Sequence, residues 1–416
     1  MLKTIYPSAA SGVVDAPPSK SMTQRAIAAA LLAKGDTSIY NPSQSSDSLA
    51  ALDMIRILGA VVFPGNGKLL IHGGLNVQEQ ELNCGESGLA MRMFAPIAAL
   101  QCDQITFTGR GSLLDRPVDM IGEALTQLGV AFQSNKGRLP FRVQGPLQGG
   151  KATIDGSVSS QLLSGLLMAL PLADSDSEIH VNNLKSKPYI SLTIRLLKDL
   201  GIKIENNDFG LFKIKGRQNY LAGEYTVEGD WSGAAFLLVA GAISGNLCVK
   251  GLLQNSEQSD RAILSVLKSA GARMTVKSDC IEIEKSELRP FSFDASDCPD
   301  LFPPLASMAA YCNGISRILG AERLAFKESN RAIAIQQEMA KLGIKIKLDG
   351  NEMIIEGGKI SGAFVNSHND HRIAMMAAVA ALAAEGPVFI EDAGCIAKSY
   401  PGFFDDLLHL GAKIEG

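Results

Sequence analysis

Six segments of this 416-residue chain share one pattern, and that pattern restricts the possible folds more than any other feature. Each segment has the apolar spacing of an amphipathic helix, then a glycine, then a strand-like run, as in "IGEALTQLGVAF" and "IQQEMAKLGIKI". Glycine suits the left-handed residue that commonly ends a helix. Successive glycines are separated by 68 to 72 residues, and they are Gly59, Gly129, Gly201, Gly271, Gly343 and Gly411. The chain is therefore predicted to contain six copies of one structural unit.

A second helix is expected in each copy, polar at its start and rich in Ala, Leu and Met along its body. These helices are predicted to begin near Lys20, Glu86, Ser159, Trp231, Asp300 and Asp370. A helix that is apolar all round is buried, whereas the glycine-terminated helices carry a charged face and belong outside. Each copy is longer than a usual solenoid repeat, so two compact α/β domains of three copies each are favoured.

The domain boundary is expected between the third and fourth copies, near "YLAGEYTVEGDWSG". The chain start, "MLKTIYPSAASG", lies outside the first copy, and we expect it to complete a sheet in the C-terminal half. The predicted N-terminal domain is therefore 14–227, and the C-terminal domain is 1–13 plus 228–416. The two crossings, near 12–16 and 225–230, would form a hinge.

Composition narrows the class of protein. The chain is 46% hydrophobic and 20% charged, as in ordinary globular proteins, and a net charge of −4 argues against a general nucleic-acid surface. The seven cysteines include no Cys-x-x-Cys pair, so we expect reduced, mostly buried thiols and no metal. The N-terminus has no apolar signal core, and no run reaches membrane-spanning length, which predicts a cytoplasmic protein.

Polar and basic residues gather where the first three inner helices begin. Exposed N–H groups and the helix dipole make such a position an anion site, and Ser and Gln side chains add donors. Taken singly, each serine is more typical of a helix cap and each cation of a solvated surface. The repetition at equivalent places favours binding. The residues are Lys20, Ser21, Arg25, Gly88, Arg92, Ser159, Ser160 and Gln161.

Acids and further cations occupy the heads of later helices. "SHNDHR" places Arg372 at a helix start, where arginine opposes the dipole and so needs another reason to be there. Asp300 lies at the fifth inner helix, and "KESNR" places Lys327, Glu328 and Arg331 at an outer helix. Singly, these acids are equally well explained as helix caps. A carboxylate beside cations is also what proton transfer around an anionic substrate requires.

Together these residues resemble the enolpyruvyl transferase superfamily, and within it the 3-phosphoshikimate 1-carboxyvinyltransferase (EPSP synthase) family. The resemblance covers essentially the whole chain. Its motifs follow one another in the family's order: "SKSMTQR", "CGESGLAMR", "DRP", "DGSVSSQ", "SKPY", "GDWSGAAF", "PD", "KESNR", "NDHR" and "AKSYP".

The resemblance implies an inside-out α/β barrel fold of six βαβαββ-type repeats, three in each of two domains that close over the substrates. It implies transfer of the enolpyruvyl group of phosphoenolpyruvate to the 5-hydroxyl of shikimate 3-phosphate, in aromatic amino acid biosynthesis, without metal or organic cofactor. Phosphoenolpyruvate maps onto Lys20, Gly88, Arg116, Gln161, Arg331, Arg372 and Lys398. Shikimate 3-phosphate maps onto Lys20, Ser21, Arg25, Ser159, Ser160, Gln161, Ser186, Asp300 and Lys327, with Tyr189 nearby.

The implied reaction assigns roles to three residues. The 5-hydroxyl attacks carbon 2 of phosphoenolpyruvate while carbon 3 gains a proton, and the tetrahedral intermediate then expels phosphate. Asp300 is the expected base for the hydroxyl, and Glu328 and Lys20 are candidates for proton delivery. Neither nucleic acid nor a membrane is an expected partner, and the protein is expected to be a monomer.

Five positions depart from the family's usual residues. The chain has Glu86, Ser87, Leu89 and Met93 where the family commonly has Asn, Ala, Thr and Pro, and Arg323 where an asparagine often contacts shikimate 3-phosphate. These positions bear on glyphosate response and on fine ligand geometry. UDP-N-acetylglucosamine 1-carboxyvinyltransferase and a non-catalytic homologue remain as alternatives, together with an RNA 3′-phosphate cyclase of related fold, which the net negative charge disfavours.

Overall fold

Each of the six glycines predicted to end a helix has a positive φ in the computed structural model, which describes residues 1–157 and 159–416. Their φ values lie between +82° and +114°, where a side chain is disfavoured. The helices before them are α2 (Ser46–Ile57), α4 (Asp119–Gln127), α6 (Lys187–Asp199), α8 (Ile263–Ser269), α10 (Arg331–Lys341) and α12 (Phe403–His409). The predicted repeat is therefore present in the backbone.

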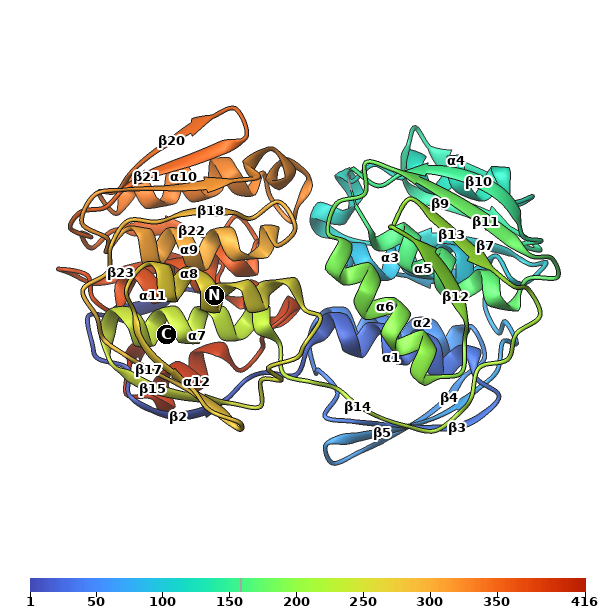
Figure 1. Cartoon of the computed structure of the whole chain (residues 1–416), viewed down its shortest axis with the longest axis horizontal. Coiled ribbons are helices and arrows are strands. Elements are labelled where there is room, and N and C mark those ends of the chain that lie inside the picture. Colours follow the sequence, from blue (N-terminus) through green and yellow to red (C-terminus); the bar gives the residue numbers. More distant parts are fainter. Residues whose placement is uncertain (158) are drawn as a thin grey trace. The chain divides into compact units, whose positions relative to one another are not determined.

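The chain divides into two units, which we call the N-unit (18–227) and the C-unit (1–17 with 228–416). Figure 1 shows the N-unit from blue to green, and the C-unit mainly from yellow to red. Over the described residues, each unit contains three four-stranded sheets, and all six have the same strand pairing: the first pair parallel, the second and third pairs antiparallel. This six-fold repetition of a mixed α/β unit agrees with the predicted fold class.

The N-unit sheets follow the repeats in order. The first is β14 (Glu224–Thr226), β3 (Gly35–Tyr40), β5 (Lys68–Gly73) and β4 (Val61–Gly65). The second is β6 (Glu81–Asn83), β7 (Gln104–Thr108), β9 (Arg138–Gln144) and β8 (Ala131–Asn135). The third is β10 (Gly150–Asp155), β11 (Ser177–Asn182), β13 (Leu211–Ile214) and β12 (Ile204–Asn207).

The C-unit sheets take two strands from the chain start. The first is β2 (Gly12–Asp15), β15 (Asn246–Lys250), β17 (Cys280–Glu284) and β16 (Arg273–Val276). The second is β18 (Ser292–Asp294), β19 (Ile315–Leu319), β21 (Glu352–Glu356) and β20 (Lys345–Asp349). The third is β22 (Phe364–Asn366), β23 (Val388–Glu391), β1 (Lys3–Tyr6) and β24 (Lys413–Glu415). In Figure 1 the blue strand β2 lies beside the yellow β15, which pairs with β17 on its other side. The expectation that the chain start completes a sheet in the C-terminal half is confirmed.

The second set of helices fills the interior of each unit. In the N-unit these are α1 (Lys20–Leu32), α3 (Gly88–Ala98) and α5 (Gln161–Ala169), and in the C-unit α7 (Trp231–Ser244), α9 (Phe302–Ala309) and α11 (His371–Ala381). Every residue of α7 is buried, and so is every residue of α3, α9 and α11. The three inner helices of a unit contact one another, and their Ala, Leu and Met side chains form its core.

One glycine shows how closely the inner helices approach. A Cβ atom on Gly165 of α5 would lie 2.5 Å from the backbone oxygen and 2.8 Å from the Cα of Met93 in α3. Only glycine allows this separation, because any side chain would push the two helices apart. The heads of α3 and α5 are consequently held near each other, and both carry predicted site residues.

Two further expectations concern the chain as a whole. All seven cysteines are free thiols; five are buried, Cys248 is half-buried and Cys102 is exposed. Among the residues that the structure describes, no helix combines the length and apolar character needed to cross a membrane.

Candidate functional site

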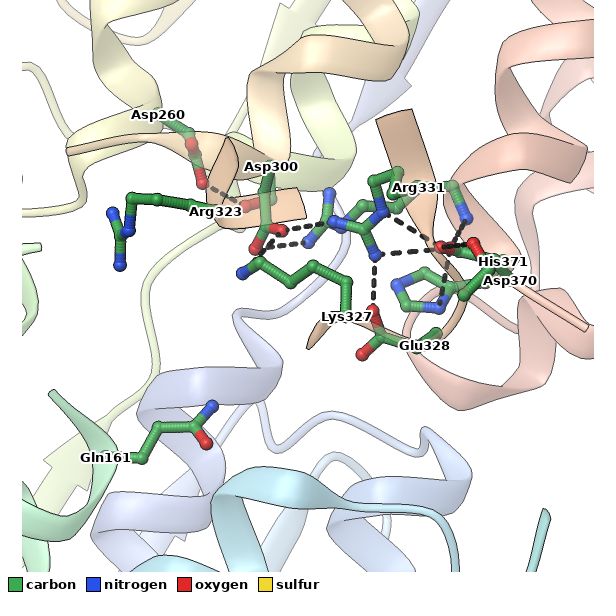
Figure 2. A network of polar contacts seen from close by, with 12 residues as sticks. Gln161, Asp260, Asp300, Arg323, Lys327, Glu328, Arg331, Asp370 and His371 are labelled. Carbon is green, nitrogen blue, oxygen red and sulfur yellow. Dashed lines mark hydrogen bonds and ion pairs between the residues drawn. The ribbon is translucent and has the colours of Figure 1, made fainter. Parts of the chain in front are cut away.

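Arg331 is the centre of a buried ionic cluster in the C-unit. Its guanidinium is 0% exposed and contacts three carboxylates that come from separate segments (Figure 2). Nε lies 2.9 Å from Asp370 Oδ2, Nη1 lies 2.7 Å from Asp300 Oδ1, and Nη2 donates to Glu328. A buried arginine needs such partners, because an unpaired charge in a protein interior is strongly unfavourable. Arg331 thus links Asp300, Glu328 and Asp370 into one group.

Asp300 is shared among three cations. Besides its contact with Arg331, Asp300 has Arg372 Nη2 at 3.2 Å from Oδ2 and Lys327 Nζ at 3.5 Å from Oδ1. Burial alone raises the pKa of Asp300, but attraction to Arg372, Lys327 and Arg331 outweighs it and holds the pKa well below its ordinary value. The alternative reading of Asp300 as a helix cap is wrong, because Asp300 lies in the short 3-10 helix η4 (Pro299–Leu301) and Leu301 precedes α9 without a side-chain cap.

Asp370 connects the cluster to the head of α11. Its carboxylate caps that helix by accepting from the Arg372 N–H at 3.0 Å, and it also accepts from the Ser329 hydroxyl at 3.1 Å. The neighbouring Asn369 carbonyl accepts from Lys398 Nζ at 2.6 Å, and Lys398 ends the 3-10 helix η6 (Ala393–Lys398). Arg372 and Lys398 are therefore both placed by the turn that enters α11.

Asp260 belongs to the same cluster, although sequence reasoning did not single it out. It lies in the 3-10 helix η3 (Ser259–Ala262), is 1% exposed, and accepts a hydrogen bond from the Ser232 hydroxyl. Burial, and to a smaller extent repulsion from Asp300, raises the pKa of Asp260 to about 6. Asp260 and Asp300 are thus two acids whose proton affinities are shifted in opposite directions.

In the N-unit, Arg25 of α1 is a buried cation whose hydrogen bonds all go to neutral oxygen atoms. Nε donates to Thr193 Oγ1 at 2.9 Å, Nη2 to Ser164 Oγ at 3.2 Å, and Nη1 to the Ser21 carbonyl at 3.0 Å. The Tyr189 ring lies 5.9 Å from the guanidinium carbon. Burial lowers the pKa of Arg25 to about 10. A buried positive charge with neutral hydrogen-bond acceptors is suited to receive an anion.

Two more guanidinium groups meet at the head of α3. A Cβ on Gly88 would lie 2.4 Å from Arg116 Nη1 and 3.1 Å from Arg92 Nη1, so both groups approach the bare Cα of this glycine. Arg92 Nη1 also donates to Gln161 Oε1 at 2.9 Å, and Gln161 begins α5. The dipole of α3 adds to the positive charge at this point. Gly88, Arg92, Arg116 and Gln161 therefore form a compact anion-attracting group.

The remaining predicted residues of the N-unit lie at or next to helix starts. Lys20 Nζ pairs with Asp47 Oδ2 at 2.9 Å. Ser159 Oγ accepts from the Gln161 N–H at 3.2 Å, as a helix cap does, and Ser160 precedes α5 without a side-chain cap. Ser186 is the left-handed residue before α6, with φ +55°, and is 5% exposed.

The predicted residues divide between the two units. The N-unit group consists of Lys20, Ser21, Arg25, Gly88, Arg116, Ser159, Ser160, Gln161 and Ser186, and the C-unit group consists of Asp300, Lys327, Glu328, Arg331, Arg372 and Lys398. Arg92 was noted in the sequence at the α3 head but not assigned to a ligand. Asp260 was not predicted from the sequence. Its segment "QSDR" precedes an outer helix, as "KESNR" does, and this shared position could have indicated a role in the site.

The departures from the family pattern lie in different surroundings, and Ser87 caps α3 by accepting from the Ala90 N–H. Leu89 and Met93 are buried in the N-unit core, 7% and 0% exposed. The Glu86 carboxylate lies against Gly111, where an added Cβ would be 2.4 Å from Oε2. Arg323 of η5 (Ala321–Phe326) donates to the Ser296 carbonyl and is labelled beside Asp300 in Figure 2. Glu86 and Arg323 therefore have polar contacts, whereas Leu89 and Met93 pack in the core.

One group among the described residues has metal-ligand character: Cys248, Cys280 and Glu282, whose ligand atoms lie within 4.8 Å of one another. It lies on strands β15 and β17, not at a helix head. The Lys277 ammonium is already paired with the Glu282 carboxylate. We assign no metal to this group, because its one carboxylate is neutralised and it offers only three ligands.

Comparisons with known proteins agree in pointing to one family. A sequence profile described as EPSP synthase (3-phosphoshikimate 1-carboxyvinyltransferase) matches residues 6–407. The 3-phosphoshikimate 1-carboxyvinyltransferase of Clostridium kluyveri is 38% identical, over 99% of this chain and 98% of its own length. That of Methanocorpusculum labreanum is 39% identical, over 97% of each chain.

Solved structures show the same fold. An EPSP synthase from Acinetobacter baumannii superposes with a TM-score of 0.83 at 27% identity, covering 100% of this chain and 99% of that one. The enolpyruvyl transferase NikO from Streptomyces tendae superposes with a TM-score of 0.81 at 20% identity, covering 100% of this chain and 98% of that one, and so supports the fold alone.

Proposed function

The chain belongs to the EPSP synthase family, and we propose that the cations of the N-unit and C-unit groups bind phosphoenolpyruvate and shikimate 3-phosphate. As a member of this family it transfers the enolpyruvyl group of phosphoenolpyruvate to the 5-hydroxyl of shikimate 3-phosphate and releases phosphate. What remains to be assigned is the role of each residue.

For phosphoenolpyruvate we propose Gly88 and Arg116 at the head of α3, together with Arg372 and Lys398 at the turn that enters α11. The phosphate and carboxylate of this substrate need at least two separate cationic contacts. Arg116, which lies against Gly88, supplies one of them. Arg372 and Lys398, which flank Asn369 at the start of α11, supply the other. Lys20, Gln161 and Arg331 complete the proposed set. Arg331 would act mainly by holding Asp300 and Glu328 in place, since its guanidinium is fully buried among carboxylates.

For shikimate 3-phosphate we propose Arg25 as the main phosphate-binding cation, because its charge is buried among neutral oxygen atoms. The hydroxyl groups of Ser21, Ser159, Ser160 and Ser186 would add donors around the same phosphate. Lys20, Gln161, Asp300 and Lys327 complete the proposed set, with Asp300 accepting a hydrogen bond from the 5-hydroxyl.

The single observation that carries the catalytic assignment is the placement of Asp300 among Arg331, Arg372 and Lys327. In the addition step, Asp300 takes the proton of the 5-hydroxyl as its oxygen bonds to carbon 2, while Glu328 or Lys20 gives a proton to carbon 3. In the elimination step, the group that protonated carbon 3 takes a proton back from it, and the bond between carbon 2 and the phosphate oxygen breaks with its electron pair going to the phosphate. The cations stabilise the negative charge carried by the leaving phosphate.

A phosphate-release assay tests this function directly. With shikimate 3-phosphate and phosphoenolpyruvate together, we expect release of phosphate that requires both substrates. UDP-N-acetylglucosamine in place of shikimate 3-phosphate should support none. Release with UDP-N-acetylglucosamine alone as acceptor would overturn the substrate assignment.

We further propose that the two units act as separate domains joined at residues 17–18 and 227–228, and that the protein is a monomer. The two units have separate hydrophobic cores, which supports the first proposal. Sedimentation equilibrium over a range of protein concentrations tests the second, and a mass that rises with concentration would reject it.

A further inference from the structure

We propose that Glu338 is a positioning residue for phosphoenolpyruvate binding, because it anchors the turn that carries Arg372 and the carbonyl that holds Lys398. Glu338 lies in the middle of α10, is 1% exposed, and was not among the residues that sequence reasoning selected. The proposal rests on the proposed function, in which Arg372 and Lys398 contact phosphoenolpyruvate.

The Glu338 carboxylate contacts the turn twice. Oε2 accepts from the Asn366 backbone N–H at 2.8 Å, and Oε1 contacts His368 Nε2 at 2.7 Å. Lys341 Nζ, one turn further along α10, lies 2.9 Å from Oε1 and 2.7 Å from Oε2. Burial raises the pKa of Glu338, but the hydrogen bonds from Lys341, Asn366 and His368 outweigh it, so the pKa lies below its ordinary value. Glu338 therefore remains a carboxylate at neutral pH.

The turn needs anchoring because its backbone is unusual. His368 and Asn369 both have left-handed backbones, with φ +52° and +54°, immediately before the α11 cap Asp370. Two successive non-glycine residues in this region are uncommon, and the surrounding contacts have to hold them there. Asn366 Oδ1 helps by accepting from the His368 N–H at 2.7 Å. Glu338 is bonded to the residues on both sides of Ser367.

The same helix holds the turn at a second point. Arg331 lies seven residues before Glu338 and therefore on the same face of α10. It donates hydrogen bonds to Asp370 at the end of the turn, whereas Glu338 binds Asn366 and His368 at its beginning. Releasing Glu338 frees one end of the turn, and the Asn369 carbonyl that receives Lys398 at 2.6 Å then moves with it.

The residues proposed for shikimate 3-phosphate do not lie on this turn. In the C-unit they are Asp300 and Lys327, which precede α9 and α10. Loss of the Glu338 anchor is therefore expected to weaken phosphoenolpyruvate binding selectively, whereas a general loss of stability would weaken binding of both substrates.

The test compares full-length Glu338→Gln and His368→Ala with Gln336→Ala as a matched control. Gln336 is on the same helix but donates to the Ile346 carbonyl, away from the turn. We expect Glu338→Gln to raise the KM for phosphoenolpyruvate about tenfold to hundredfold, with the KM for shikimate 3-phosphate changed less than about threefold. His368→Ala, which removes a partly exposed ring, should act in the same direction, and Gln336→Ala should leave both KM values unchanged.

Equal increases in both KM values, or no increase in either, would overturn the proposal. Hydrogen exchange of residues 364–372 in the substrate-free protein separates this outcome from failure of the proposed function. If wild-type protein showed no turnover, the function would be wrong, and exchange alone would decide: faster exchange in Glu338→Gln than in Gln336→Ala supports the anchor, and equal exchange refutes it.

Discussion

Arg331 Nη1 lies 2.7 Å from Asp300 Oδ1, so the carboxylate proposed to accept the substrate proton also neutralises a fully buried arginine. A carboxylate held by three cations binds protons weakly and is a poor base. Phosphate and carboxylate groups of the substrates would engage these cations and weaken their pull on Asp300. Substrate binding is thereby expected to raise the basicity of Asp300 when a proton has to be accepted.

Replacing Asp300 by Asn tests the base role. The amide oxygen can still accept from Arg331, but it cannot take a proton, so kcat should fall about a hundredfold to ten-thousandfold. Circular dichroism should report an unchanged fold. Asp297→Asn, an exposed neighbour, is the control and should turn over normally. Near-normal turnover in Asp300→Asn would transfer the base role to Glu328 or Lys20.

Gly88→Ala tests the meeting point of Arg92 and Arg116. The new methyl group would lie 2.4 Å from Arg116 Nη1, which forces the guanidinium away from the α3 head. We expect the KM for phosphoenolpyruvate to rise about tenfold or more, with stability little changed. Gly223→Ala is the matched control, because nothing lies within 4 Å of its added Cβ. Unchanged kinetics in Gly88→Ala would remove this group from the phosphoenolpyruvate site.

Arg25→Met separates binding from stability. A buried charge with neutral partners contributes little net stability, so an apolar side chain of similar length should leave the free energy of unfolding nearly unchanged. Affinity for shikimate 3-phosphate should fall about tenfold to hundredfold, because a charge-assisted hydrogen bond is lost. Calorimetric titration and urea unfolding measure the two quantities. Loss of stability with unchanged affinity would identify Arg25 as purely structural.

Asp260→Asn is expected to change how stability depends on pH. The pKa of Asp260 is about 6 in the folded protein against an ordinary value of 3.8, so the folded state binds more protons between these limits. Its contribution to stability is present below pH 4 and is lost as pH rises through 6. Asn does not ionise, so above pH 6 the free energy of unfolding of the variant should exceed that of the wild type by up to roughly 3 kcal/mol. Urea unfolding at pH 4 and pH 7.5 measures this, and an equal difference at both would contradict it.

The fold could be predicted largely from the sequence because its main signal is local and repeated. A glycine after a helical pattern specifies a positive φ wherever it occurs, and six occurrences at one period define the repeat. The inner helices begin within two residues of the predicted positions, for example Gly88 rather than Glu86 and Phe302 rather than Asp300. Boundaries differ because caps such as Ser87 depend on hydrogen bonds that composition does not reveal.

The site was less accessible to sequence reasoning because its defining contacts are long-range. Arg25 meets Thr193 and Ser164 from another repeat, and Arg331 meets Asp370, 39 residues away. Asp260 has no distinctive spacing to Asp300, and its role depends on burial and on Ser232. The residue types at the helix starts indicated an anion-binding site. Which of these cations are already paired with carboxylates, and which have neutral partners, could be learned only from the observed contacts.

The strand pairing of the chain start has a consequence for synthesis on the ribosome. All strands of the N-unit, β3 to β14, lie between residues 35 and 226, so this unit can fold as soon as its last strand has emerged. Strand β2 pairs with β15, which follows the N-unit, and β1 pairs with β23 and β24, which are made much later. Strand β1 is thus translated long before both of its partners, and it must stay unpaired while the residues between them are made and fold.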